Sequence, residues 1–169
     1  MSIVWKSIPG PVGNLIVAAS PEGLIGAWFE VQEHFAGIRP EWRHDPAALV
    51  LVAAERQYAE WFAGTRRDFE LPLAPVGSEF HRQVWAAIRR VAYGATSTYG
   101  EVAAALGQPG AARAVGAATG RNPFTIIVPC HRLVGWNGAL TGYAGGLDRK
   151  RALLAFEAAG TPFELTTSA

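Results

Sequence analysis

The stretch "TYGEVAAALGQPGAARAVGAATG", residues 98–120, decides how the C-terminal half of the chain folds. Thr98 and Glu101 form a capping box, in which the hydroxyl accepts a hydrogen bond from the Glu101 amide and the carboxylate reaches back. The helix that starts here runs to Gly107, "QPG" turns the chain, and residues 111–120 form a second short helix. Two short helices joined by a tight, glycine-containing turn predict a helix-turn-helix.

Further helices flank this motif. Ser78 can cap a helix that ends at Gly94. The apolar residues of that helix recur at helical spacing, and they are Phe80, Val84, Trp85, Ile88 and Val91. A last helix spans "LDRKRALLAFEAAG", with Asp148 near its start and Gly160 after its end. This part of the chain therefore predicts a mainly helical domain.

The first third of the chain has the pattern of β-strands. "SIVWKSI", "NLIVAAS" and "GLIGAWFE" are short apolar runs separated by "PGPVG" and "SPEG", which is typical of strands joined by tight turns. A helix follows, with Asp45 as its N-cap, Pro46 at its first position and Gly64 closing it. "DFELPL" predicts one more short strand. With "APVGS" as the boundary, we expect an α+β protein with a small antiparallel-sheet domain over residues 1–76 and a helical domain over 77–169.

Composition limits the classes of protein that fit. The chain has 169 residues, 50% of them hydrophobic, and six tryptophans, which favours one folded domain or two small ones. No apolar run reaches the about 20 residues that span a bilayer, and the first residues lack the pattern of a signal peptide. A single cysteine forms neither an internal disulfide nor a multi-cysteine zinc site. We therefore expect a soluble, cytoplasmic protein.

The net charge of +1 hides an asymmetry between the two halves. Residues 1–78 hold six Lys and Arg against nine Asp and Glu, whereas residues 79–169 hold nine against five. The C-terminal half is therefore the one suited to face a polyanion. Many helical domains carry such an excess without binding nucleic acid, so the charge alone does not decide the function.

Cys130, the only cysteine, lies in "IIVPCH", residues 126–131. Free cysteine is often buried as a small apolar side chain, and this interpretation stays open. The alternative is a nucleophile. Pro129 ends a strand-like run just before the thiol, and His131 follows it, which suits formation of a thiolate, directly or through a bridging water. Glu157 on the last helix is a candidate to orient the imidazole.

Three neighbouring features also have two interpretations each. The Ala- and Gly-rich helix 111–120 suits either close helix packing or close approach to a nucleic-acid groove, with Arg113 as its one long side chain. The glycine-rich loop 138–146 around Tyr143 lacks the spacing of a phosphate-binding loop and suits a loop that folds over a bound base. Asn122 is either a turn residue or a brace for the cysteine segment.

Together, "ARAVGAATGRNP", "IIVPCHRLVG" and "LTGYAGGLDRKRALLAFE" resemble the O6-alkylguanine-DNA alkyltransferase family, the methylated-DNA–protein-cysteine methyltransferases. The resemblance covers residues 80–157 in consistent order, and "PCHR" is the family's signature. It implies a ribonuclease-H-like N-terminal domain and transfer of an alkyl group from O6 of guanine, less efficiently from O4 of thymine, to Cys130. The thioether product is stable, so each molecule acts once, and neither a cofactor nor a metal is needed.

The resemblance also implies roles for individual residues around Cys130. His131 and Glu157 match the partners that are linked to the cysteine through water, and Asn122 matches the asparagine that braces the active-site turn. Tyr99 matches the tyrosine that hydrogen-bonds the flipped base. Flipping is required because the O6 substituent is stacked inside the duplex, out of reach of a buried thiol.

The DNA contact and the base pocket follow from the same resemblance. Arg113 matches the arginine that enters the duplex and fills the space left by the target base. The helix surface that fits the minor groove consists of Ala114, Gly116 and Ala117. The pocket residues are Leu133, Tyr143, Ala144, Gly145 and Thr119. Some relatives place a larger residue where Thr119 stands, or a serine where Ala144 stands, which affects pocket size and substrate range. We expect a monomer that binds double-stranded DNA, and cooperative binding stays open.

Two other functions differ from this expectation. Alkyltransferase-like relatives bind alkylated DNA but lack the acceptor cysteine, whereas this chain has Cys130. A cysteine hydrolase would need an oxyanion hole and a path for turnover, and the sequence carries no family signature for them. The chain also lacks the cysteine-rich metal domain of some relatives, so we expect neither phosphotriester repair nor a transcriptional role.

Overall fold

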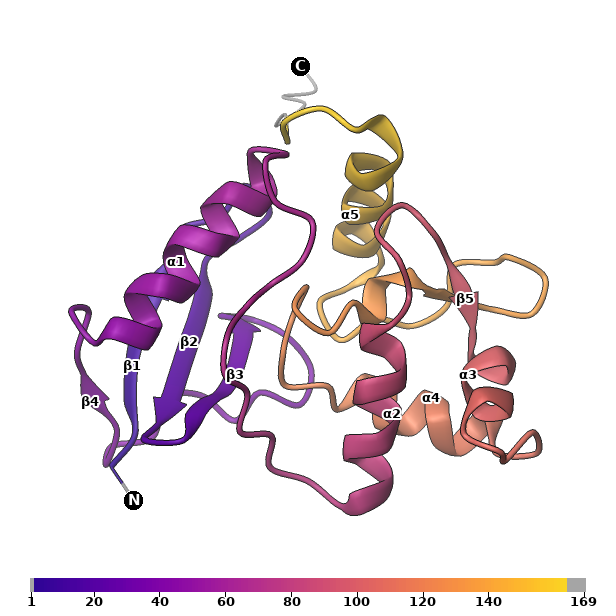
Figure 1. Ribbon diagram of the computed structural model, residues 1–169, viewed down its shortest axis with the longest axis horizontal. Helices are drawn as coiled ribbons and strands as arrows, with labels where there is room; N and C mark the ends of the chain where they lie inside the picture. Colours follow the sequence, from indigo (N-terminus) through magenta and orange to yellow (C-terminus); the bar gives the residue numbers. More distant parts are fainter. Residues whose placement is uncertain (1, 164–169) are drawn as a thin grey trace.

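A four-stranded sheet with one covering helix forms the N-terminal part of the computed structural model, which describes residues 2–163 (Figure 1). The strands follow the order β3-β2-β1-β4. They are β1 (Val4–Ile8), β2 (Leu15–Ser20), β3 (Gly23–Phe29) and β4 (Arg43–His44). The pairs β1–β2 and β2–β3 are antiparallel, whereas the short β4, which the sequence did not predict, runs parallel to β1.

Helix α1 (Leu49–Phe62) packs against β1 and β2. Its start is later than the sequence predicts: Ala48 is the N-cap, and Asp45 is not. The Ala48 amide donates to the Asp45 carbonyl at 3.2 Å, so the chain makes a turn with Pro46 at its second position before the helix begins. Aspartate followed by proline suits the first two positions of a β-turn as well as a helix start, and here the turn prevails.

The expected strand "DFELPL" is wrong. Only Leu73 forms an isolated bridge, to Leu24. The Leu24 amide donates to the Pro72 carbonyl and the Ala74 amide donates to the Leu24 carbonyl. Pro72 has no amide hydrogen, so it cannot donate to an extended ladder, and the pairing stays this short.

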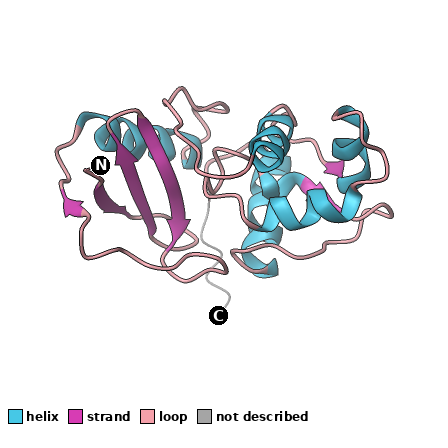
Figure 2. Ribbon diagram, turned by 90° about the horizontal axis from the view of Figure 1, so that it is seen from below, coloured by secondary structure: helices cyan, strands magenta, loops and turns pink. Residues whose placement is uncertain are grey.

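As far as residue 163, the C-terminal part contains four α-helices, one short 3-10 helix (Cys130–Arg132) and a minimal two-stranded sheet. The helices are α2 (Glu79–Arg89), α3 (Tyr99–Ala105), α4 (Ala112–Gly120) and α5 (Leu147–Ala159). The parallel strands β5 (Ser97–Thr98) and β6 (Leu133–Val134) were not predicted, because two residues carry no periodicity. The predicted α+β architecture, with a helical part after a sheet, is confirmed (Figure 2).

The N-caps of α2 and α3 form as the sequence predicts only in part. The Ser78 hydroxyl accepts from the His81 amide at 3.1 Å, as predicted, but α2 ends at Arg89, before Gly94. The Thr98 hydroxyl accepts from the Glu101 amide at 3.0 Å. The Glu101 carboxylate instead accepts from the Ser97 hydroxyl, so only half of the capping box forms.

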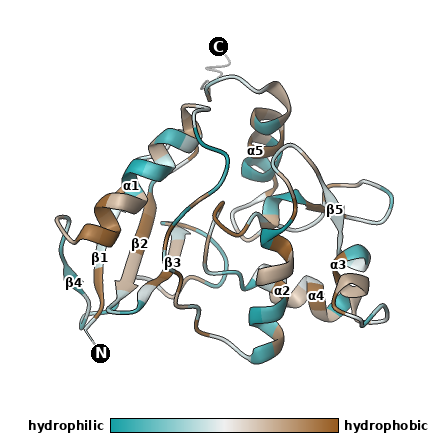
Figure 3. Cartoon of the chain, viewed as in Figure 1, coloured by the Kyte–Doolittle hydropathy of each residue, from teal (hydrophilic) through white to brown (hydrophobic). Residues whose placement is uncertain are grey.

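The sheet and the helical part meet at the segment that leads to Cys130. The Ala27 amide of β3 donates to the Pro123 carbonyl at 2.7 Å, and the Thr125 amide donates back to Ala27 at 2.9 Å. The hydroxyl of Tyr58, buried on α1, also donates to the Thr125 carbonyl. In Figure 3, β2 is largely brown or pale brown, in keeping with an apolar layer under α1. The N-terminal sheet thus fixes the start of the cysteine segment.

Candidate active site

The segment before Cys130 folds differently from the strand-like run that the sequence predicts. Residues 126–128 form tight turns, in which the Val128 amide donates to the Phe124 carbonyl at 3.0 Å. Ile126 has φ 70°, a left-handed conformation that β-branched residues rarely adopt. The apolar side chains are buried as in a strand, so burial explains their pattern and strand pairing does not.

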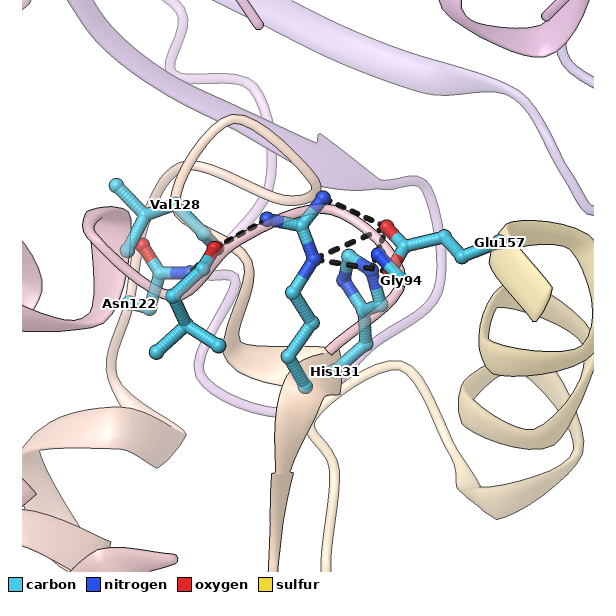
Figure 4. A network of polar contacts seen from close by, with 7 residues as sticks. Gly94, Asn122, Val128, His131 and Glu157 are labelled. Atoms are coloured by element: carbon cyan, nitrogen blue, oxygen red, sulfur yellow. Dashed lines mark hydrogen bonds and ion pairs between the residues drawn. The ribbon is translucent and has the colours of Figure 1, made fainter. Parts of the chain in front are cut away.

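Asn122 holds these turns in place and also contacts the sulfur. Its Oδ1 accepts from the Phe124 amide at 2.9 Å, and its Nδ2 donates to the Val128 carbonyl at 2.8 Å. The same Nδ2 lies 3.2 Å from Sγ of Cys130 and donates to it. Figure 4 shows Asn122 and Val128 side by side. Strained backbone persists where surrounding bonds enforce it, and Asn122 supplies these bonds.

Behind Cys130, three charged or titratable side chains form a buried cluster. Nε2 of His131 lies 2.8 Å from Oε2 of Glu157, and Arg132 donates to the same carboxylate from Nε at 2.9 Å and from Nη2 at 2.7 Å. The Gly94 amide adds a fourth donor at 3.2 Å. Figure 4 shows Glu157 reaching from α5 toward His131. All three side chains are nearly inaccessible to solvent, so the charges must be paired inside the protein.

Burial and pairing shift the pKa values in this cluster in different directions. Burial would raise the pKa of Glu157, but hydrogen bonds from His131 and Arg132, with their charges, outweigh it and lower the pKa to about 2. Burial lowers the pKa of His131, and the hydrogen bond to Glu157 opposes this. At neutral pH the carboxylate is therefore ionised and the imidazole is neutral. The carboxylate accepts the hydrogen on Nε2, which leaves Nδ1 as a hydrogen-bond acceptor.

The thiol itself needs a proton acceptor. Burial raises the pKa of Cys130, although the hydrogen bond from Asn122 and the charge of Lys150 oppose the shift. Nδ1 of His131 is buried and has no hydrogen-bond partner within residues 2–163. A buried ring nitrogen that is free to accept, on the residue next to a protonated thiol, suits a general base acting directly or through one water.

Cys130 lies on a cavity of about 530 Å³ that opens to solvent. Half of the predicted site residues line it, namely Cys130 itself, Tyr99, Arg113, Gly116, Thr119, Tyr143 and Ala144. Ala114 and Ala117 lie on the exposed surface of α4, outside the cavity lining, and Leu133 is fully buried in β6. Gly145 lies against the rings of Tyr143 and Phe29. A Cβ at this position would approach the Tyr143 ring to 2.8 Å and the Phe29 ring to 3.0 Å, so only glycine fits without a shift.

Two basic side chains that the sequence analysis passed over hold the loop at the cavity. Nζ of Lys150, which is fully buried, donates to the Thr141 carbonyl at 3.1 Å and to the Gly142 carbonyl at 3.4 Å. Arg149 donates from Nη1 to the Gly145 carbonyl at 3.2 Å. The Tyr99 hydroxyl bonds to the Thr141 hydroxyl at 2.9 Å. Charged residues at a helix start usually face solvent, so no sequence signal marked Lys150 as buried.

Arg132 makes a third contact that the sequence did not indicate. A bidentate pair needs the carboxylate of α5 to lie opposite it, and that placement comes only from the tertiary structure. Within residues 2–163, no group of three His, Cys, Asp or Glu side chains is arranged to hold a metal ion. No helix in the same range is long and apolar enough to cross a membrane.

Two family models match adjacent stretches of the chain. Residues 3–75 match the ribonuclease-like domain of 6-O-methylguanine DNA methyltransferase. Residues 79–159 match the DNA binding domain of 6-O-methylguanine DNA methyltransferase.

Individual proteins match over most of their length. The methylated-DNA–protein-cysteine methyltransferase of Mycolicibacterium paratuberculosis is 43% identical over 164 residues, which cover 97% of this chain and 98% of the relative. The one from Methanosarcina acetivorans is 44% identical over 147 residues, or 87% and 93% of the two chains. A crystal structure described as Mycobacterium tuberculosis OGT in complex with DNA has a TM-score of 0.87 and 42% identity, and covers 94% of this chain and 95% of that one.

Proposed function

The chain belongs to the 6-O-methylguanine DNA methyltransferase family and is a methylated-DNA–protein-cysteine methyltransferase that repairs O6-methylguanine directly; from this premise we propose that Cys130 is the acceptor. One observation carries the proposal. The single thiol of the chain lies on a cavity open to solvent, hydrogen-bonded by Asn122 and adjacent to the buried pair of His131 and Glu157.

The proposed reaction is one displacement at the methyl carbon. Nδ1 of His131 takes the thiol proton through one water, and Glu157 stabilises the resulting imidazolium. The Cys130 sulfur attacks the methyl carbon, the S–C bond forms as the C–O6 bond breaks, and the electron pair leaves with guanine. The Tyr99 hydroxyl, on the cavity wall, hydrogen-bonds the base at N3 and relieves the charge that develops on it.

The product accounts for single use. A thioether has no good leaving group, so the protein has no route back to the free thiol and each molecule repairs one base. The reaction needs no cofactor, because the substrate already carries the activated carbon. O4-alkylthymine has a similar alkyl–oxygen bond, and we propose it as a second, less efficient substrate.

We further propose that the target base leaves the duplex to reach the cavity. Helix α4 presents Ala114, Gly116 and Ala117, whose small side chains allow close approach to the minor groove, and the exposed Arg113 beside them fills the space of the flipped base. Asn122 keeps the cysteine turn in place. The pocket for the base consists of Leu133, through its carbonyl, with Tyr143, Ala144, Gly145 and Thr119.

The remaining assignments follow from this chemistry. We propose that residues 1–76 form a structural domain and that residues 77–169 bind DNA and accept the alkyl group. The reaction involves one thiol and one lesion, which suits a monomer. A reduced thiol is required, and the cytoplasm keeps cysteines reduced, so we propose that the protein works there.

The test is the mass of the intact protein after incubation with a duplex that carries one O6-methylguanine. We expect a gain of one methyl group per molecule, found on the peptide with Cys130, and no second gain with excess substrate. Cys130→Ser is the matched control: it abolishes transfer while it keeps DNA affinity, because the groove contacts lie elsewhere. Methyl on another residue would refute the assignment of Cys130, and binding without any mass change would indicate a binding-only protein.

A further inference from the structure

Trp136 is the most exposed large apolar side chain of the part of the chain that the structure describes, with 90% of its surface accessible. It lines the same cavity as Cys130, Tyr99 and Arg113. Neither the proposed chemistry nor the proposed base pocket uses it. A large aromatic ring left in water beside a reactive cavity calls for an explanation.

The other tryptophans differ from it. Each of the five contacts another aromatic ring, and they are Trp5, Trp28, Trp42, Trp61 and Trp85. Trp61, for example, is completely buried and lies 4.8 Å from the Phe156 ring. Trp136 makes no such contact within residues 2–163. The fold therefore uses its other indole rings for packing and leaves this one free.

The backbone around Trp136 is held by hydrogen bonds. The Gly138 amide donates to the Gly135 carbonyl at 2.8 Å, which closes a turn with Trp136 at its second position. The Gly135 amide donates to Ala139 at 2.9 Å, and Oδ1 of Asn137 accepts from the Ala139 amide at 3.1 Å. The Trp136 ring is therefore exposed on a turn whose backbone is fixed by hydrogen bonds.

The small sheet sets where this turn lies. Strands β5 and β6 are parallel, with Thr98 opposite Val134. Because the two strands are parallel, the segments that follow them leave the sheet at the same end. The residues after Val134 therefore lie beside Tyr99, which follows Thr98 at the start of α3. Trp136 therefore lies on the side of the cavity where the helix-turn-helix begins.

We propose that the Trp136 ring stacks on the nucleotide next to the target base in the bound DNA strand. This rests on the proposed function, in which the target base leaves the duplex. Its departure exposes a face of the neighbouring nucleotide, and a flat apolar ring at the cavity mouth can cover that face. Stacking on an aromatic side chain does not depend on base identity, which suits a protein that must find a lesion in any sequence context.

Continuity with the reactive cavity favours DNA as the occupant. Arg113, Tyr99 and Trp136 surround one opening, and the half of the chain that carries them has an excess of basic residues. The alternative is that the exposed ring contacts a second copy of the chain. Sedimentation of the wild type and of Trp136→Ala without DNA tests this alternative, because only that contact would make the wild type a dimer.

The test compares Trp136→Ala, Trp136→Phe and the control Leu49→Ala, which removes an 87%-exposed apolar side chain from the start of α1. Binding to a duplex with one O6-methylguanine is measured by fluorescence anisotropy, and methyl transfer is measured on the duplex and on free O6-methylguanine. We expect Trp136→Ala to weaken duplex binding about tenfold, with a larger loss of transfer on the duplex than on the free base. Trp136→Phe should recover most of the affinity, and Leu49→Ala should match the wild type.

The outcomes separate this inference from the proposed function. Unchanged duplex affinity in Trp136→Ala, with normal transfer by the wild type, would overturn the stacking role alone. Equal losses on the duplex and the free base would also overturn it, because stacking acts only on DNA. A dimer that dissociates in the variant would assign the ring to a second copy. Failure of the wild type to transfer methyl from either substrate would instead refute the proposed function.

Discussion

The floor and the rim of the reactive cavity are built in opposite ways. On the floor, Cys130 accepts a hydrogen bond from Asn122, and His131 is paired with Glu157, and all four side chains are buried. On the rim, Arg113 and Trp136 extend into solvent. The contacts of the floor are complete in the folded protein, whereas the proposed contacts of the rim form only when DNA binds.

The floor and the rim contribute to different free energies, the floor to folding and the rim to DNA binding. Buried polar and charged groups must be paired, so each floor residue supports the folded state as well as the reaction. Exposed side chains contribute little to stability, so the rim can be specialised for DNA at small cost to the fold. Substitutions on the floor should therefore change stability and transfer together, and substitutions on the rim should change transfer alone.

Glu157→Gln should have the largest effect. It removes the negative charge that pairs with buried Arg132 and orients His131, and loss of one partner from a buried ion pair costs about 3–5 kcal/mol. We expect a lower free energy of unfolding in urea and a much slower methyl transfer at neutral pH. The control Glu79→Gln breaks an exposed pair with Arg82 and should cost less than about 1 kcal/mol. Glu157→Gln with wild-type stability would mean that the floor is not held by this pair.

The pH dependence of the same pair has a defined sign. The pKa of Glu157 falls from an ordinary 4.5 to about 2 on folding, so the unfolded chain takes up a proton first as the pH drops. The stabilisation is complete above about pH 4.5 and is lost as the pH falls toward 2. The difference in unfolding free energy between the wild type and Glu157→Gln should therefore shrink over that range. A constant difference would contradict the assigned pKa.

Arg113→Ala tests the rim and should have the next largest effect. Without the side chain that fills the space of the flipped base, transfer from duplex DNA should slow about 10- to 100-fold, since unstacking a base costs a few kcal/mol. Transfer from free O6-methylguanine should fall less, and the free energy of unfolding should stay within about 0.5 kcal/mol of the wild type. An equal decrease in the transfer rate on both substrates would show that Arg113 has no role in base flipping.

The sequence predicted those parts of the molecule that depend on local signals. Three strands, the Ser78 cap and the two helices of residues 98–120 follow from periodicity, capping residues and glycine, and all of them form. Local signals were wrong where two local structures compete. Asp45 and Pro46 start a turn and not a helix, and the apolar run before Cys130 forms turns and not a strand.

The resemblance supplied the candidate site residues and the pairing of His131 with Glu157, but it gave no sign of the contacts made by Arg132 and Lys150. Glu157 comes 25 residues after Arg132, and only the packing of α5 against the cysteine segment brings the two together. Lys150 is completely buried, although charged residues in the first turn of a helix usually face solvent. These two contacts depend on tertiary geometry, and neither periodicity nor capping residues in the sequence indicate them.

Arg149 belongs to neither the floor nor the rim, since it joins the rim loop to the N-terminal sheet. Its Nε donates to Val12 at 2.8 Å and its Nη1 donates to Val31 at 3.1 Å, while the same Nη1 bonds to the loop at Gly145. Its guanidinium lies 4.2 Å from the centre of the Phe29 ring. The N-terminal part thus positions the pocket loop without touching the reacting atoms.

Arg149→Ala should have the smallest effect of these substitutions, and it tests whether the N-terminal part positions the loop between floor and rim. We expect it to lower the free energy of unfolding by about 1–2 kcal/mol, through lost hydrogen bonds. Transfer should slow about threefold on both duplex and free base, because a looser loop misplaces either substrate alike. Arg151→Ala is the matched control, since that neighbour makes only an exposed pair with Asp148. A loss confined to duplex DNA would place Arg149 with the rim. Stability and rates equal to those of the control would mean that the sheet does not position the loop through Arg149.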